Sequence, residues 1–556
     1  MTTPTATASV TIVGAGTCTI TANQAASTNY NAAPQAMQSF SIAKAPTQFT
    51  VAAQTFVSFG STPAISGTLN RGPGFTSVFP ASGVTATLKK NGVAVVSPNN
   101  PYSPASNPPN GAFTVSDAGI VPDDYTVTFD FTGNANFLAA PSITTALRVE
   151  GFSNAPNMSV GRAGHSSTLM NDGNVLVVGG DDGTGVPPGT PSPTAIAEVY
   201  CTAVAGPTCT SAGDVGTFKA VGSLNTARFG HTATLLFDGT VLVAGGITDA
   251  TSDPTANAEV YCTAVAGPLC TAPSDVGKFK TVATAMQTAR AGHTATLLPD
   301  NTVLLVGGVV SSSGPPTNTS EVYCTAMTGP VCTLPADVGK FKSAASMATP
   351  RDSHTATLLA DGTVLVTGGE IDAAGNPTNT AEVYCTAVAG PLCTAPVDVG
   401  SFKPAASAMS SARSIHTASL LADGRVLVAG GVNALPNSTT ATADVYCAAI
   451  GGPCAAADGT FKPVGDLATA RAFHAAALLK DGFALVAGGL DASSVTLKSS
   501  ELFDPTGNSF VGSGPMSVAR SLPAATRLPD GRLLVTGGRT GGGTVVNSAE
   551  LYNGPY

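Results

Sequence analysis

A sevenfold repeat between residues 152 and 552 constrains the fold of this chain more than any other feature. Each unit opens with Arg-x-x-His, and the first glycine of a Gly-Gly pair follows 14 residues after the histidine. An Asp-Gly dipeptide lies midway, replaced by Asp300-Asn301 in the third unit, and the seventh unit is degenerate, with Arg520 and Pro523. Such a period predicts an array of stacked structural units. The first six units carry Arg162 and His165, Arg228 and His231, Arg290 and His293, Arg351 and His354, Arg413 and His416, and Arg471 and His474.

Each unit has the pattern of four short strands. Apolar runs flank the Asp-Gly dipeptide, which predicts a hairpin whose two turn residues both accept positive φ. An acidic-aliphatic-aromatic triplet predicts a third strand, and a later phenylalanine opens a fourth. Because one four-stranded sheet of this size cannot bury both faces alone, we expect the seven sheets to stack radially as blades of a β-propeller. The triplets begin at Glu198, Glu259, Glu321, Glu382, Asp444, Glu501 and Glu550.

The two ends of the repeat region predict how the ring closes. The seventh unit ends at Tyr552, four residues before the end of the sequence, so its fourth strand is missing. Phe152 precedes Arg162 by the same ten residues that separate Phe218 from Arg228. We therefore predict that a strand starting near Phe152 completes the last blade.

The N-terminal part of the chain contains a different repeat. Residues 18–34 align without gaps to residues 125–141, at a constant offset of 107. A period near 100 residues with alternating strands is typical of immunoglobulin-like β-sandwiches. We expect residues 45–150 to form one such domain, 1–44 to be the C-terminal part of a truncated one, and 151–556 to be the propeller. Because so short a piece cannot bury its apolar face, we expect its first half, and a signal peptide, to lie upstream of this sequence.

Ten of the eleven cysteines form close pairs in the loop after the third strand of blades one to five. Each loop offers two sulfurs and no histidine, whereas zinc needs four ligands, so we predict five local disulfides. They imply an oxidising compartment and therefore a secreted or cell-surface protein. Cys18 is expected to pair with a cysteine of the absent half-domain. The predicted bonds are Cys201–Cys209, Cys262–Cys270, Cys324–Cys332, Cys385–Cys393 and Cys447–Cys454.

Charge and repeat position exclude several partners and sites. A net charge of −9 gives no basic surface for nucleic acid or anionic lipid, and no apolar run is long enough to span a membrane. The six histidines share one repeat position, which disperses them around a ring, so we interpret them as structural residues and expect no metal or cofactor. The seven arginines match the seven triplet acids in number, which predicts inter-strand or inter-blade ion pairs.

The loop between the second and third strands differs most among the blades, and loops on a rigid scaffold usually carry recognition. Its acidic residues are the candidate ligand-binding positions: Asp181, Asp182, Asp249 and Asp372. One hypothesis is a Ca²⁺ site at Asp181 and Asp182; the other is that all four are solvated turn residues. The expected partner is an unidentified protein or glycan, although the absence of Trp weakens stacking on sugars.

The repeated motifs, Arg-x-x-His, Asp-Gly, Gly-Gly and Glu-Val-Tyr in that order, resemble the kelch repeat of galactose-oxidase-like proteins. The resemblance covers residues 152–552, with Phe where kelch units usually carry Trp. Residues 45–150 are similar to bacterial Ig-like surface modules. Together these resemblances imply a seven-bladed kelch-type propeller preceded by an Ig-like sandwich and part of a second one.

Three functions follow as hypotheses. The first is a non-catalytic, extracellular bacterial propeller on Ig-like spacers, acting as a binding or adhesion platform. The second, implied by the resemblance alone, is a galactose-oxidase-like carbohydrate or alcohol oxidase. It requires copper held by tyrosine and histidine, a tyrosine cross-linked to cysteine, and an indole, and the sequence has no Trp and no histidine outside the repeat positions, so we expect no enzyme. The third, an intracellular kelch adaptor, is opposed by the cysteine pattern and the Ig-like domain.

Overall fold

The structure is a computed structural model that describes residues 15–24, 33–51, 54–57, 64–71, 84–90, 93–94, 112–116, 122–185, 190–434, 438–448, 453–456 and 458–554. These residues form an all-β protein, in which the only helices are four 3-10 turns of three residues each. The chain divides into two compact units, Met1–Glu150 and Gly151–Gly554. Among the described residues, no helix is long and apolar enough to cross a membrane.

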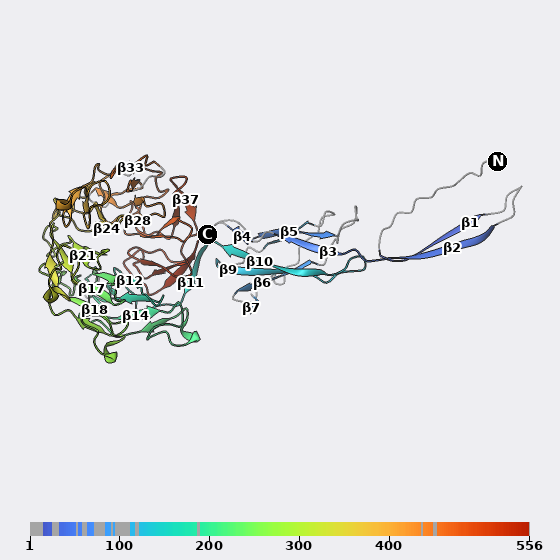
Figure 1. The fold of residues 1–556 in the computed structure, drawn as a ribbon, viewed down its shortest axis with the longest axis horizontal. Coiled ribbons are helices and arrows are strands. Elements are labelled where there is room, and N and C mark those ends of the chain that lie inside the picture. Colours follow the sequence, from blue (N-terminus) through green and yellow to red (C-terminus); the bar gives the residue numbers. More distant parts are fainter. Residues whose placement is uncertain are drawn as a thin grey trace. The chain divides into compact units, whose positions relative to one another are not determined.

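Seven four-stranded antiparallel sheets make up the second unit, and Figure 1 shows them following one another around a central axis. We number these blades one to seven in chain order. The first four are β12–β15 (Ser166–Leu169, Val175–Val178, Ala197–Tyr200, Phe218–Ala220), β16–β19 (Thr232–Leu235, Val241–Ala244, Ala258–Tyr261, Phe279–Thr281), β20–β23 (Thr294–Leu297, Val303–Val306, Ser320–Tyr323, Phe341–Ser343) and β24–β27 (Thr355–Leu358, Val364–Thr367, Ala381–Tyr384, Phe402–Pro404).

The fifth and sixth blades follow the same order of strands. A small hairpin, β30 (Val432–Ala434) and β31 (Ser438–Thr439), is inserted between the second and third strands of blade five. Blade five contains β28 (Thr417–Leu420), β29 (Val426–Ala429), β32 (Ala443–Tyr446) and β33 (Phe461–Pro463), and blade six contains β34 (Ala475–Leu478), β35 (Ala484–Ala487), β36 (Ser500–Asp504) and β37 (Ser509–Ser513).

The last blade joins the two ends of the second unit. Its strand order is β11-β40-β39-β38, and β11 (Gly151–Ala155) pairs antiparallel with β40 (Ala549–Asn553). Phe152 lies opposite Tyr552, with the ring centroids 4.9 Å apart. The prediction that a strand near Phe152 completes the last blade is confirmed. The other two strands are β38 (Ala524–Arg527) and β39 (Leu533–Thr536), and the first strands of successive blades contact one another around the ring, including β38 with β12.

The packing between blades explains the apolar second strands. All four residues of β17 are buried, because a blade is covered by a neighbour on each face. One core cluster combines Leu242 and Val260 of blade two with Val303, Leu305 and Tyr323 of blade three. Burial of each such side chain stabilises the fold by about 1.5–3 kcal/mol.

The Asp-Gly turns differ from the two-residue turn that the sequence predicts. In blade one the C=O of Met170 accepts the N–H of Gly173, while the N–H of Met170 donates to Asn174. Only the second turn residue has positive φ, 83° at Gly173 and 70° at Asn301. The prediction of positive φ at both residues is therefore wrong. The connection is the longer hairpin loop in which a turn is followed by one left-handed residue, a place that Gly fills best and Asn tolerates.

The first unit has two sheets that share one apolar core, which includes Phe49, Leu69, Leu88, Phe129 and Leu147. One sheet contains β3 (Thr47–Val51), β5 (Ala64–Arg71) and β8 (Ala112–Ser116). The other contains β4 (Gln54–Val57), β10 (Ala140–Val149), β9 (Asp124–Phe131), β6 (Val84–Lys90) and β7 (Val93–Ala94).

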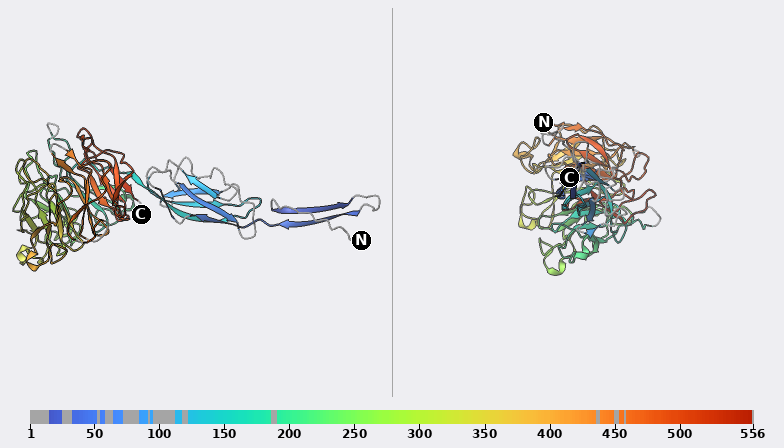
Figure 2. Two further views of the ribbon diagram at one scale, coloured as in Figure 1. Left: turned by 90° about the horizontal axis from the view of Figure 1, so that it is seen from above. Right: turned by 90° about the vertical axis from the view of Figure 1, so that its right-hand side faces the viewer.

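A separate antiparallel hairpin, β1 (Gly16–Gln24) with β2 (Ala33–Ile42), precedes these sheets (Figure 2). The offset of 107 maps β9 and β10 onto β1 and β2, although residues 25–32 of the aligned segment lie outside the described part. Its apolar side chains are exposed, for example Met37, and Cys18 is a free cysteine. The immunoglobulin-like assignment of residues 45–150, and of 1–44 as a partial copy, stays a prediction.

Candidate binding site at one end of the propeller axis

The repeated arginines are buried and tie each blade together. Arg228 makes an ion pair of 3.0 Å with Glu259 and donates to the C=O groups of Gly245 and Asn257. The Glu259 carboxylate also accepts the backbone N–H of Asn225, in the segment that enters the blade. The ion pairs lie within blades, so the inter-blade alternative is wrong. The seven pairs, at 2.6–3.0 Å, are Arg162–Glu198, Arg228–Glu259, Arg290–Glu321, Arg351–Glu382, Arg413–Asp444, Arg471–Glu501 and Arg520–Glu550.

The histidines connect consecutive blades. Nε2 of each histidine forms a hydrogen bond with a hydroxyl group of the preceding blade, and the bond between His165 and Thr536 joins blade one to blade seven. Burial, and then the charge of Arg228, lower the pKa of His231 to about 3, so this side chain is neutral at pH 7. The bonds are His165–Thr536, His231–Ser166, His293–Thr232, His354–Thr294, His416–Thr355 and His474–Thr417, at 2.8–3.0 Å.

The histidine–hydroxyl bond has no counterpart between blades six and seven, where both of its partners are replaced. Pro523 stands at the histidine position of blade seven. The matching position of blade six, the first residue of β34, is Ala475, which has no hydroxyl group. Both the histidine and the hydroxyl group of this hydrogen bond are therefore absent at the boundary between blades six and seven.

The Gly-Gly pairs are contact points between blades, a role that the sequence analysis did not assign. The N–H of Gly180 donates to the C=O of Arg228 in the next blade. A Cβ on Gly179 would lie 2.5 Å from that oxygen and 2.8 Å from His231 Cε1, so no larger residue fits. At the ring closure Gly538 donates to Arg162 in the same way.

A closed ring of seven backbone hydrogen bonds surrounds the propeller axis. It is formed by the residue two places after each repeated arginine, whose N–H donates to the C=O of the equivalent residue in the preceding blade, at 2.8–3.5 Å. The N–H of Gly164 closes the circle on Leu522. We call these residues the axial ring: Gly164, Gly230, Gly292, Ser353, Ile415, Phe473 and Leu522.

Every member of the axial ring has a left-handed backbone. Blades one to three place glycine there, but Ser353, Ile415, Phe473 and Leu522 have φ of 53–56°. Such a conformation costs on the order of 1–2 kcal/mol for a residue with a side chain, and it is least tolerated by a β-branched residue such as Ile415. Because backbone strain of this kind gathers at functional sites, this end of the axis is the candidate site.

A second layer of residues flanks the axial ring. In each blade the residue after the arginine forms a β-bridge with the residue after the Gly-Gly pair, where the loop between the second and third strands begins. The candidate ligand loops therefore start at the same end of the axis as the axial ring. We call these pairs the rim: Ala163–Asp181, Phe229–Ile247, Ala291–Val309, Asp352–Glu370, Ser414–Val432, Ala472–Leu490 and Ser521–Arg539.

Asp181 is a buried rim residue whose carboxylate is fully engaged. It accepts the N–H groups of Gly183 and Ser192, and it forms an ion pair with Arg539 of blade seven. Residues 186–189 of this loop lie outside the described part. Because Asp181 is neutralised by Arg539, the structure gives no support to Ca²⁺ at Asp181 and Asp182.

The other three candidate acids are turn residues that the structure does not bring together. Asp182, Asp249 and Asp372 belong to the loops of blades one, two and four. Each accepts the backbone N–H two residues later in the chain, from Thr184, Thr251 and Ala374 respectively. In the described residues, no group of three or more His, Cys, Asp or Glu side chains is placed to hold a metal ion.

The rim pair of blade four, Asp352 and Glu370, was not predicted from the sequence as part of a site. Asp352 exposes 7% of its surface, and its Oδ1 is buried with no hydrogen-bond partner among the described residues. Its Oδ2 accepts Ser353 Oγ at 3.0 Å, and Glu370 accepts Ser414 Oγ at 3.2 Å. Burial, and then the charge of Glu370, raise the pKa of Asp352 to about 7. A signal existed: Asp352 is the only acid directly after a repeated arginine.

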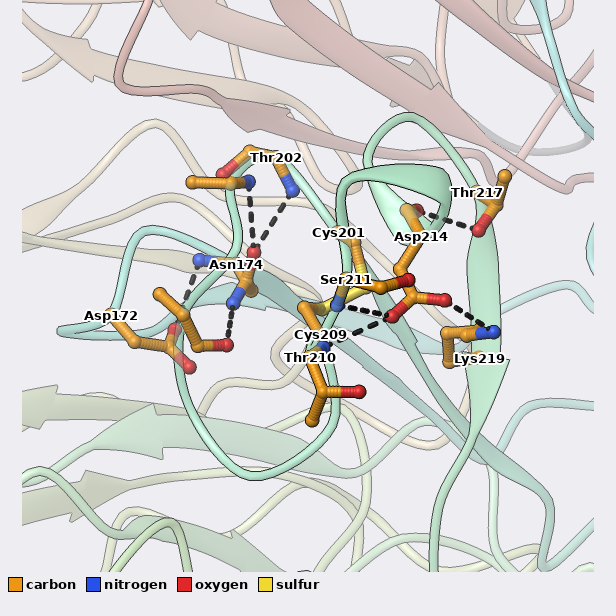
Figure 3. The surroundings of a disulfide bond; sticks show 12 residues. Asp172, Asn174, Cys201, Thr202, Cys209, Thr210, Ser211, Asp214, Thr217 and Lys219 are labelled. Carbon is orange, nitrogen blue, oxygen red and sulfur yellow. Dashed lines mark hydrogen bonds and ion pairs between the residues drawn. A yellow bond between two sulfur atoms is a disulfide. The ribbon is translucent and has the colours of Figure 1, made fainter.

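The opposite end of the axis carries the Asp-Gly turns and the cysteine loops, and Figure 3 shows the surroundings of the disulfide in the loop of blade one. Thr202 Oγ1 donates to the C=O of Gly173 in the turn, and Asp214 forms an ion pair with Lys219 at 2.6 Å. The cysteine loops thus pack on the hairpin turns of their own blades. All five close pairs are disulfides: Cys201–Cys209, Cys262–Cys270, Cys324–Cys332, Cys385–Cys393 and Cys447–Cys454.

No protein-family model matches the chain, and no curated protein is detectably similar to it in sequence. Among solved structures, a fungal alcohol oxidase of the AA5 family in complex with copper superposes with a TM-score of 0.52 at 17% identity, over 73% of this chain and 77% of that one. The structure of YjhT superposes with a TM-score of 0.44 at 12% identity, over 65% of this chain and 99% of that one. The likeness to the oxidase shows a shared propeller fold and nothing further.

The residues present do not fit a copper-radical centre of the kind that the kelch resemblance implies. The six histidines are divided among six blades, and each uses Nε2 on a hydroxyl group of its neighbour. The propeller cysteines are all in disulfides. Tyrosines such as Tyr261 are buried against a phenylalanine of their own blade, here Phe279 at 5.0 Å.

Proposed function

We propose that this protein is a non-catalytic extracellular binding or adhesion platform, in which Ig-like spacers of bacterial type present a kelch-type propeller. The ligand, a protein or a glycan, binds at the end of the axis that carries the axial ring and the rim. The observation that supports this best is the distribution of variation among the blades. Ion pairs, histidine bonds and Gly-Gly contacts repeat around the ring, whereas the seven rim pairs and the loops that start from them all differ.

A secreted or cell-surface location follows from the disulfides. Five bonds in one unit are typical of an oxidising compartment. The net charge of −9 opposes nucleic acid as the partner.

The test is a screen of the full chain on arrays of glycans and extracellular proteins, followed by blocking of one end of the axis. Ser313 is exposed in the loop between the second and third strands of blade three, and Ser274 is exposed in a cysteine loop at the other end. Each is changed to cysteine in a Cys18→Ser background and coupled to polyethylene glycol. We expect the polymer at position 313 to block the array ligand and the polymer at 274 to leave binding intact. The opposite result would place the site at the cysteine loops.

The alternative is a carbohydrate or alcohol oxidase. The observation in its favour is the fold shared with a copper alcohol oxidase, at a TM-score of 0.52. Copper loading followed by elemental analysis, with a peroxide assay on galactose and primary alcohols, separates the two functions. One copper per chain together with peroxide production would favour the oxidase.

A further inference from the structure

We propose that the rim of blade four binds an organic cation, an ammonium or guanidinium group, between the carboxylates of Asp352 and Glu370. This inference rests on the proposed function, because it names the ligand chemistry of the same end of the axis. It is carried by two acids that form no ion pair within the described residues, the buried Asp352 and the partly buried Glu370, and by the Oδ1 of Asp352, which has no hydrogen-bond partner there.

The charges on the rim are balanced everywhere except at blade four. Asp181 of blade one forms an ion pair with Arg539 of blade seven. Asp352 and Glu370 form no ion pair within the described residues, and their polar side-chain contacts are the hydroxyl groups of Ser353 and Ser414. The remaining rim residues are uncharged, so no rim residue supplies a cation to the two acids.

The buried carboxylate of Asp352 lowers the stability of the fold. A buried carboxylate is normally paired or surrounded by several donors, yet Asp352 receives one hydroxyl bond and its Oδ1 receives none. Burial and the nearby Glu370 also raise the pKa of Asp352 to about 7, as expected for an acid that lacks a countercharge. Residues that cost stability are retained where function needs them.

The Asp352 carboxylate is directed toward the axial ring. A Cβ built on Gly292, the ring member of blade three, would lie 3.6 Å from Asp352 Oδ2. Glu370 reaches the other way and accepts Ser414 of blade five. The rim pair of blade four therefore reaches blade three through Asp352 and blade five through Glu370, and the ligand would lie over these three blades at the end of the axis.

An organic cation suits this position better than a metal ion. Calcium needs six to eight oxygen ligands, and the described residues hold no cluster of three metal-binding side chains. An ammonium or guanidinium group is satisfied by a few acceptors, and charge-assisted hydrogen bonds to a carboxylate are strong. The half-buried Ile415, whose N–H donates to Ser353 in the axial ring, adds apolar surface next to the acids for an alkyl stem.

Isothermal titration of the full chain with n-butylamine and methylguanidine tests the proposal, with n-butanol as the neutral isostere. We expect saturable binding of one cation per chain and none of the alcohol. Asp352→Asn and Glu370→Gln each lower the affinity about tenfold or more, whereas Asp458→Asn, an exposed turn acid of a cysteine loop at the other end of the axis, leaves it unchanged. Melting curves of all variants show that they are folded.

Titrations with further ligands identify the source of the cation. N-acetyl-lysine N-methylamide that binds more tightly than n-butylamine indicates a lysine of a protein, and equal affinity indicates a free amine. The proposal is overturned if neither cation binds saturably, if binding survives both acid variants, or if Ca²⁺ binds instead and is lost in those variants. An array ligand blocked at position 313 without any amine binding would refute the cation and keep the platform function.

Discussion

A single carboxylate, that of Asp352, works against the stability of the blade that holds it. At pH 8 its buried charge lacks a countercharge, so Asp352→Asn removes a penalty of about 1–3 kcal/mol. We expect the melting temperature of the variant to rise by about 2–4 °C per kcal/mol. The pKa is raised from 3.8 to about 7 in the folded protein, so the penalty grows between pH 4 and 7 and is complete above 7. Scanning calorimetry should therefore show a larger gain at pH 8 than at pH 5, and a lower melting temperature of the variant at pH 8 would contradict the argument; Asp249→Asn is the control.

Six buried histidines make the propeller sensitive to acid. The unfolded chain protonates its histidines near pH 6.5, whereas burial keeps the pKa of His231, His354 and His474 at about 3 in the folded protein. Stability is therefore complete above pH 6.5 and falls as the pH drops toward 3, by about 1.4 kcal/mol per pH unit for each histidine. Urea unfolding at pH 7, 6 and 5 measures this slope. His231→Gln, whose amide can still reach Ser166, should reduce the slope by the share of one histidine, and an unchanged slope would show that the histidines do not cause it.

The cysteine loop is an element that braces its blade without being needed to form it. Blade six connects β36 and β37 by a short turn with no cysteine and still forms four strands. We therefore expect the double variant Cys262→Ser, Cys270→Ser to keep its strand content by circular dichroism and to lose about 2–3 kcal/mol, the value for a loop of this length. Loss of cooperative unfolding, or of strand signal, would mean that the disulfide is essential to the blade.

The elements were largely predictable, whereas the connections between them were only partly so. Strands follow from local apolar patterning that recurs seven times, and the strand at Phe152 follows from spacing alone. The prediction for the turn at Gly173 was wrong because an Asp-Gly dipeptide occurs in two hairpin geometries. The hydrogen bond between Met170 and Asn174 selects the longer one.

The candidate site needed the closed ring to become visible. Ile415 has no local reason to adopt a φ of 53°; it does so because its N–H completes a bond to Ser353, 62 residues earlier in the chain. Asp352 and Glu370, 18 residues apart in the sequence, likewise meet across a β-bridge of blade four. Sequence patterns report local preferences, whereas the bond of Ile415 is imposed by the assembly of blades and the pairing of Asp352 with Glu370 by the fold of its blade.

At the scale of the whole molecule, β11 determines whether the ring is closed. It covers the edge of β40, and Phe152 packs on Tyr552 as Phe218 packs on Tyr200 in blade one. Replacing residues 152–155 by Gly-Ser-Gly-Ser keeps the chain length but leaves β40 as an open edge and frees the two ends of the propeller. We expect a sharp fall in the melting temperature of the full chain.

The matched control replaces residues 218–220, the outer strand of blade one, by Gly-Ser-Gly. That blade stays linked through the chain to blade two and through β12 to blade seven, so the ring remains joined and the loss should be smaller. Two contacts join blades one and seven, His165 with Thr536 and Arg539 with Asp181. We expect these contacts to remain in the control and to weaken in the β11 variant. Equal melting temperatures for the two variants would show that these inner contacts close the ring by themselves, and an unchanged value for the β11 variant would count against closure by this strand.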